Sequence, residues 1–142
     1  MALWGTPATE GWLALCPLQL VTFAHAGLPL DSSDRTVWRF AQAQGMLLLT
    51  HNRNMRGEDS LEQTIREENT STSLPVLTIG RVERLRERSY RERCAIRLIE
   101  VGLEVEDHLG AGRIFIPWRG HLTSRCSRPS LAVLARAAEL SR

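Results

Sequence analysis

Lysine is absent from this 142-residue sequence, and all 18 basic residues are arginine. With 16 acidic residues the formal net charge is only +2, so net charge by itself predicts no partner. Exclusive use of arginine leaves two interpretations open. It is either a compositional bias of the genome or a sign of phosphate or carboxylate recognition, because the planar arginine fork binds these groups in a bidentate manner that lysine cannot match.

Cysteines and long apolar runs are also scarce. The three cysteines, Cys16, Cys94 and Cys126, are odd in number and widely spaced, so they predict neither a disulfide framework nor a metal knuckle. The longest apolar stretch, residues 13–26, is interrupted by Pro17 and is shorter than the about 20 apolar residues that a membrane-spanning helix needs. The first dozen residues contain no arginine, unlike a secretory signal. We therefore expect a cytoplasmic protein without a membrane segment.

Short apolar runs alternate with amphipathic stretches along most of the chain. The order strand, helix, strand, helix, strand, helix, strand predicts an α/β fold with a mostly parallel sheet and helices on both faces. We expect a lead-in over residues 1–18, one α/β domain over residues 19–117, and a linker with a C-terminal helix over residues 118–142. The expected strands are residues 19–23, 46–50, 74–79 and 113–116.

Capping residues place the helices between these strands. The first helix is expected to begin at Ser32 or Ser33 and to end at Gly45. A capping box over residues 60–63 begins the second helix, which ends near Asn69.

A basic stretch overlaps the start of the third expected helix. Residues 81–97 contain seven arginines, a second capping box lies at residues 89–92, and Gly110 is expected to end the helix. Interleaved glutamates at pairing distance are typical of a solvated helix face, and a nucleic-acid patch is the alternative.

Polar residues follow the ends of the expected strands, where open parallel sheets bind their ligands. Oxygen donors there suit a hard cation such as Mg²⁺ and predict a small metal-dependent phosphodiesterase site. The alternative is that the two acids are helix-terminus residues and the two amides are turn formers. The candidates are Asp34, Asn52, Asn54 and Asp59, with Arg53 and Arg56 as candidates for phosphate contact unless they belong to an ordinary exposed loop.

Several segments between Leu20 and Pro117 carry a family resemblance: the acidic helix start at Asp34, the run Leu48-Leu-Thr-His-Asn-Arg-Asn54, and residues 57–62, 73–78 and 112–117. They resemble PIN-like proteins related to VapC toxins, in an uncharacterised bacterial branch of that group. The resemblance implies a compact α/β sandwich and, in active members, cleavage of RNA that depends on Mg²⁺ or Mn²⁺ held by three or four carboxylates. It also implies RNA and an antitoxin-like protein as partners.

Carried over residue by residue, the resemblance assigns Asp34 and Asp59 to the metal and lets Asn52 and Asn54 orient water or the shell of the cation. Two departures deplete this acidic site. Residues 1–18 contain no counterpart of the first strand that ends in Asp in active relatives, and both asparagines stand where active relatives carry Asp. We therefore expect a domain of metal-dependent ribonuclease lineage with a depleted site. The alternative is a non-catalytic binding or assembly module on the same scaffold.

The missing first strand also predicts how the chain assembles. A parallel sheet without it would leave residues 20–23 and 46–49 next to a gap, and unpaired strand edges invite pairing with another chain. We expect either a homodimer, which is preferred, or a C-terminal helix that folds back to fill the gap.

Overall fold

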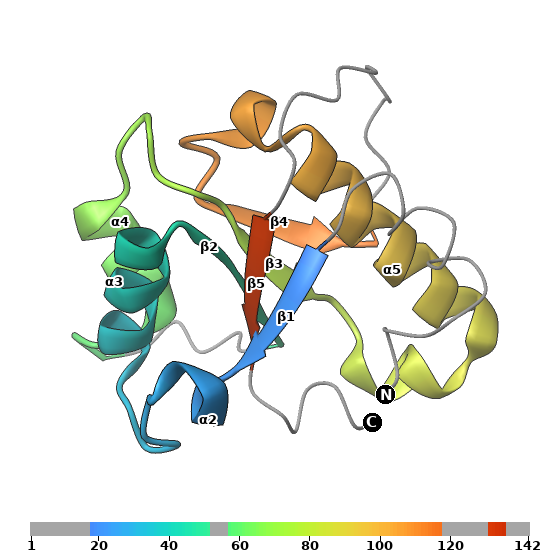
Figure 1. The fold of residues 1–142 in the computed structure, drawn as a ribbon, viewed down its shortest axis with the longest axis horizontal. Helices are drawn as coiled ribbons and strands as arrows, with labels where there is room; N and C mark the ends of the chain where they lie inside the picture. Colours follow the sequence, from blue (N-terminus) through green and yellow to red (C-terminus); the bar gives the residue numbers. More distant parts are fainter. Residues whose placement is uncertain (1–17, 52–56, 118–130, 136–142) are drawn as a thin grey trace.

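The computed structural model describes residues 18–51, 57–117 and 131–135. Their centre is a sheet of five strands, all parallel, which confirms the predicted α/β class (Figure 1). The expected lead-in and linker lie outside the described residues, apart from Leu18 and the last strand. In spatial order the strands are β1 (Leu18–Thr22), β5 (Leu131–Ala135), β2 (Met46–Thr50), β3 (Val76–Ile79) and β4 (Arg113–Ile116).

Helices cover both faces of this sheet. Helices α3 (Asp34–Gln44) and α4 (Leu61–Glu68) lie on one side and α5 (Arg88–Leu103) on the other, while the short helix α2 (Phe23–Ala26) follows β1 (Figure 1). Side chains along a strand point alternately to the two faces. Accordingly, Leu48 belongs to the apolar cluster with Trp38 of α3, whereas Leu47 and Leu49 belong to the cluster with Leu98 of α5. No helix in the described ranges is long and apolar enough to cross a membrane.

The caps of α3 and α4 are the predicted ones. The Ser33 side chain accepts the N–H of Thr36, and Gly45 ends α3 with a φ of 66°, in the left-handed region that favours glycine. The Ser60 side chain accepts the N–H of Gln63, and α4 ends before Asn69. Local capping residues therefore determine both ends of α3 and contribute to the start of α4.

Both predicted ends of the third helix are wrong. Helix α5 begins at Arg88, so Ser89 lies inside its first turn, and the Glu92 carboxylate accepts a hydrogen bond from the Arg88 side chain (2.9 Å) instead of completing a capping box. At its other end α5 stops at Leu103, and a 3₁₀ turn, η2 (Val105–His108), precedes Gly110.

The predicted C-terminal helix is also wrong, because Leu131–Ala135 forms strand β5. This strand lies between β1 and β2, where the sequence predicted a gap, and pairs with both of them. Val133, Leu134 and Ala135 are fully buried and extend the apolar clusters on both faces of the sheet. The homodimer stays a prediction, although β5 of the same chain occupies the gap from which it was inferred.

Candidate functional site at the carboxyl edge of the sheet

All five strands are parallel, so their carboxyl ends meet at one edge of the sheet. Helices α3 and α4 begin near this edge, and they position the two predicted acidic ligands that the structure describes, Asp34 and Asp59. The other predicted site residues, Asn52, Arg53, Asn54 and Arg56, lie outside the described residues.

Asp34 is the first residue of α3 and also caps α4. Its Oδ2 accepts the backbone N–H of Leu61, the first residue of α4, at 3.2 Å. Helix N-termini carry unpaired N–H groups and a partial positive charge, so a carboxylate shared by two of them is stabilised. This contact places Asp34 at the N-termini of both helices, and its assignment to a metal ion stays a prediction.

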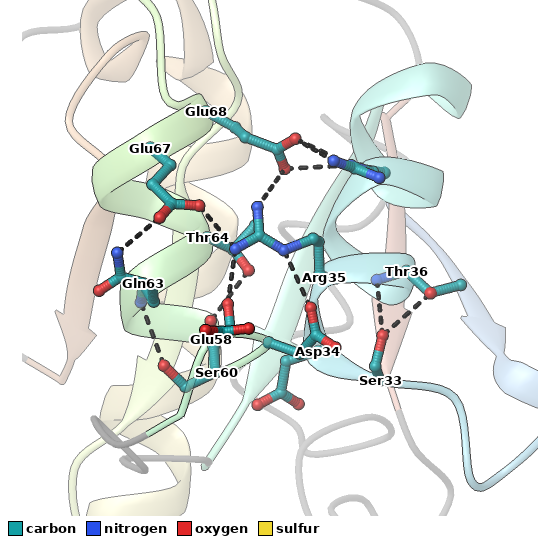
Figure 2. A network of polar contacts seen from close by, with 12 residues as sticks. Ser33, Asp34, Arg35, Thr36, Glu58, Ser60, Gln63, Thr64, Glu67 and Glu68 are labelled. Atoms are coloured by element: carbon teal, nitrogen blue, oxygen red, sulfur yellow. Dashed lines mark hydrogen bonds and ion pairs between the residues drawn. The ribbon is translucent and has the colours of Figure 1, made fainter.

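Asp59 is held by an arginine that we did not predict. Oδ1 of Asp59 accepts a hydrogen bond from Nε of Arg35 at 3.1 Å. Nη2 of the same guanidinium donates to the backbone oxygen of Glu58 (2.6 Å) and to Oε2 of Glu67 (2.7 Å). Figure 2 shows this guanidinium between helices α3 and α4. The Arg35 side chain is 16% exposed against 67% for Asp59, so the arginine is the inner member of the pair.

The C-terminal end of α4 supplies the remaining charges of this network. Carboxylates in the last turn of a helix oppose its dipole and need compensation. Arg39 compensates the charge of Glu68, and its hydrogen bonds are the main cause of the lowered pKa of Glu68. The pKa of Glu67 is lowered first by the hydrogen bond from Gln63 and then by that from Arg35. The network therefore joins α3 to α4 along one side.

These contacts do not assemble a metal site from the described residues. Among the described residues, no group of three or more histidine, cysteine, aspartate or glutamate side chains could hold a metal ion. A divalent cation beside Asp59 would also lie against the positive charge of Arg35. The predicted Mg²⁺ or Mn²⁺ site draws on Asn52 and Asn54 as well, so it stays a prediction.

No family model, curated protein or solved structure matches this chain. The resemblance to PIN-like proteins therefore stays a prediction as well. A functional interpretation of this chain therefore rests on its fold and on the contacts of its individual side chains.

A sequence signal for Arg35 was present but not used. Glu67 and Glu68 end a helix whose dipole they oppose, so they required basic partners from another element. Arg35 and Arg39 lie four residues apart on the preceding helix and therefore share one face of it. Matching the two pairs would have predicted the contact between α3 and α4.

The basic stretch begins at the same edge, directly after β3. It contains the 3₁₀ turn η1 (Val82–Arg86) and the first turns of α5. Three of its arginines form ion pairs along the chain, and two of them, Arg84 and Arg88, pair with the interleaved glutamates, which confirms that interpretation for these two. The pairs are Arg84 with Glu87 (2.8 Å), Arg88 with Glu92 (2.9 Å) and Arg97 with Glu100 (3.3 Å).

Proposed function

We propose that this chain is a PIN-like domain of the metal-dependent ribonuclease lineage that serves as a non-catalytic RNA-binding module. The observation that carries the proposal is the engagement of both predicted ligands by protein groups: Asp59 by the guanidinium of Arg35 and Asp34 by the N–H of Leu61. Metal-assisted phosphodiester hydrolysis needs carboxylates that are available to a cation. Here one carboxylate accepts a hydrogen bond from Arg35, which also pairs with Glu67 and Glu68, and the other stabilises a helix junction.

The arginines support RNA as the ligand of this module. The basic stretch follows β3 at the edge where parallel sheets bind ligands, and Arg53 and Arg56 follow β2 in the sequence. Arginine forks bind phosphate oxygens in a bidentate manner, which suits a polyphosphate backbone. An antitoxin-like protein is a further partner that we propose on the resemblance alone, and a second copy of the chain is one inferred from the missing first strand.

A hydrolase is the second candidate, and the position of Asp34 favours it. Its side chain is only partly buried, lies at the carboxyl edge of the sheet, and belongs to the predicted set that includes Asn52 and Asn54. In such a hydrolase Asp34 and the two amides would hold Mg²⁺ or Mn²⁺, with substrate phosphate completing the shell. The cation would activate water for attack on the phosphodiester.

One experiment separates the two candidates. A fluorescent single-stranded RNA is titrated with the full chain in the presence of Mn²⁺, its anisotropy is followed, and the same sample is run on a denaturing gel. We expect saturable binding and intact RNA. Asp34→Asn is the control, because its amide oxygen can still accept the N–H of Leu61. Cleavage by the wild-type chain that this variant loses would establish the hydrolase, and the absence of binding would refute the module.

A further inference from the structure

Five of the six arginines from Arg81 to Arg93 fall into two sets, and the sixth, the half-buried Arg91, donates a hydrogen bond to the backbone oxygen of Leu85. Arg84 and Arg88 are ion-paired with Glu87 and Glu92, so their charges are already compensated. A second set is exposed and forms no ion pair with any residue in the described part of the chain. This set consists of Arg81, Arg86 and Arg93.

Tyr90 holds two members of the unpaired set in place. Its ring is buried, and its hydroxyl oxygen accepts the backbone N–H of Arg81 at 3.0 Å. The guanidinium of Arg93 lies 5.6 Å from the centre of the same ring. Because the ring is fixed in the core, the backbone of Arg81 and the side chain of Arg93 have defined positions. Arg86 ends η1 between them in the sequence.

The charge around this set is locally positive. Residues 81–93 contain six arginines against three glutamates, and two of these glutamates are the partners of Arg84 and Arg88. Only Glu83 remains as an acid of this segment without an ion pair to a described residue. Residues 81–93 therefore carry a surplus of positive charge, although the formal net charge of the whole chain is only +2.

The neighbouring surface favours a polyanion over a membrane. The exposed large apolar side chains of the described ranges belong to other segments: Leu30, Leu109 and Phe115. A membrane-binding surface combines basic residues with apolar side chains that enter the lipid, and this segment offers no such side chain among its described residues. Exposed guanidinium groups that form no ion pair with a described residue, on a segment without an apolar anchor, match the phosphates of a nucleic acid strand.

We infer that Arg81, Arg86 and Arg93 form a contact surface for the phosphate backbone of single-stranded RNA. The surface begins where β3 ends and continues through η1 into the first turns of α5 (Figure 1). The inference rests on the proposed function, which it deepens by naming the residues that meet the RNA. Ion-paired Arg84 and Arg88 take no part in the contact.

Two double variants with the same change in charge test the surface. Arg81→Gln/Arg86→Gln removes two unpaired arginines, and Arg84→Gln/Arg88→Gln removes two paired ones from the same segment. Affinity for a fluorescent single-stranded RNA is measured against salt concentration, with a thermal melt of each variant to verify folding. Each lost phosphate contact lowers the slope of log affinity against log salt concentration by about 0.7. The slope of the first variant should therefore be smaller by about 1.4, which corresponds to a roughly 25-fold loss of affinity at 0.1 M salt. The second should keep the wild-type slope.

Further measurements give outcomes that distinguish failure of this surface from failure of the proposed function. Glu83→Gln removes the unpaired acid and should raise RNA affinity. If the wild-type chain binds RNA and both double variants lose equal affinity, the proposed surface is contradicted but the RNA-binding module is not. If the wild-type chain does not bind RNA, the surface and the module are both refuted. Sedimentation with vesicles of anionic lipid is the last control. Vesicle binding that depends on Arg81 and Arg86, with unchanged RNA affinity, would establish a membrane surface and overturn the inference.

Discussion

Replacing Leu134 with alanine tests the placement of β5 between β1 and β2. In the register of the sheet Leu134 lies opposite Val21 of β1 and Leu48 of β2, and its side chain is fully buried in the cluster with Trp38. Neighbours on two strands and a helix hinder collapse of the space that the mutation leaves. A buried leucine truncated in this way costs about 3–5 kcal/mol in the free energy of unfolding. For a chain of this size, that cost lowers Tm by roughly 10–20 °C.

Urea denaturation followed by circular dichroism measures this loss. Leu30→Ala makes the same chemical change at a leucine that is 72% exposed, and it should alter the free energy of unfolding by less than about 0.5 kcal/mol. If Leu134→Ala were as stable as Leu30→Ala, residues 131–135 would not be part of the core. The gap between β1 and β2 would then be open, and the prediction of a homodimer would regain its physical basis.

Three further predictions concern individual side chains. Asp34→Ala removes the acceptor for the first N–H of α4 and should lower the free energy of unfolding by about 1 kcal/mol. Asp31→Ala, at an exposed loop residue, should leave the free energy of unfolding unchanged, and calorimetry compares the two variants. Because the pKa values of Glu67 and Glu68 are lowered on folding, their contribution to stability is complete above the usual value of 4.5 and is lost as the pH falls through the lowered values. Glu68→Gln should therefore flatten the decline of the urea midpoint at acid pH, and an unchanged decline would refute this assignment. Burial raises the pKa of Cys94 to about 11, so mass spectrometry should find its thiol unalkylated at about pH 8 until the chain unfolds.

The features predicted correctly from the sequence are those that local interactions determine. The strand over Met46–Thr50 is a continuous apolar run, and the ends of α3 follow from Ser33 and Gly45, whose contacts lie within four residues. Strand β5 was not predictable in this way. Its sequence Leu-Ala-Val-Leu-Ala suits a buried helix as well as a buried strand, and its partners lie more than 80 residues earlier in the chain.

At the candidate site, too, local features were predicted from the sequence and distant contacts were not. The helix-terminus position of Asp34 followed from the sequence, but its hydrogen bond to Leu61 joins residues 27 positions apart. Arg35 was missed because its role depends on acids at the far end of another helix. The start of α5 was misplaced because the Arg88 side chain, and not the Ser89 backbone, binds the carboxylate of Glu92. In each case a tertiary or competing side-chain contact outweighed the local motif.

The proposal of a non-catalytic module requires that protein groups, and not a metal ion, engage Asp34 and Asp59. Isothermal titration of the full chain with Mn²⁺ measures whether this requirement holds, with Asp34→Asn as the matched control that retains an acceptor for Leu61. We predict that the heats of the wild-type chain and of the variant superimpose, without a saturable phase that depends on Asp34. Saturable, stoichiometric binding of Mn²⁺ that disappears in Asp34→Asn would contradict the account.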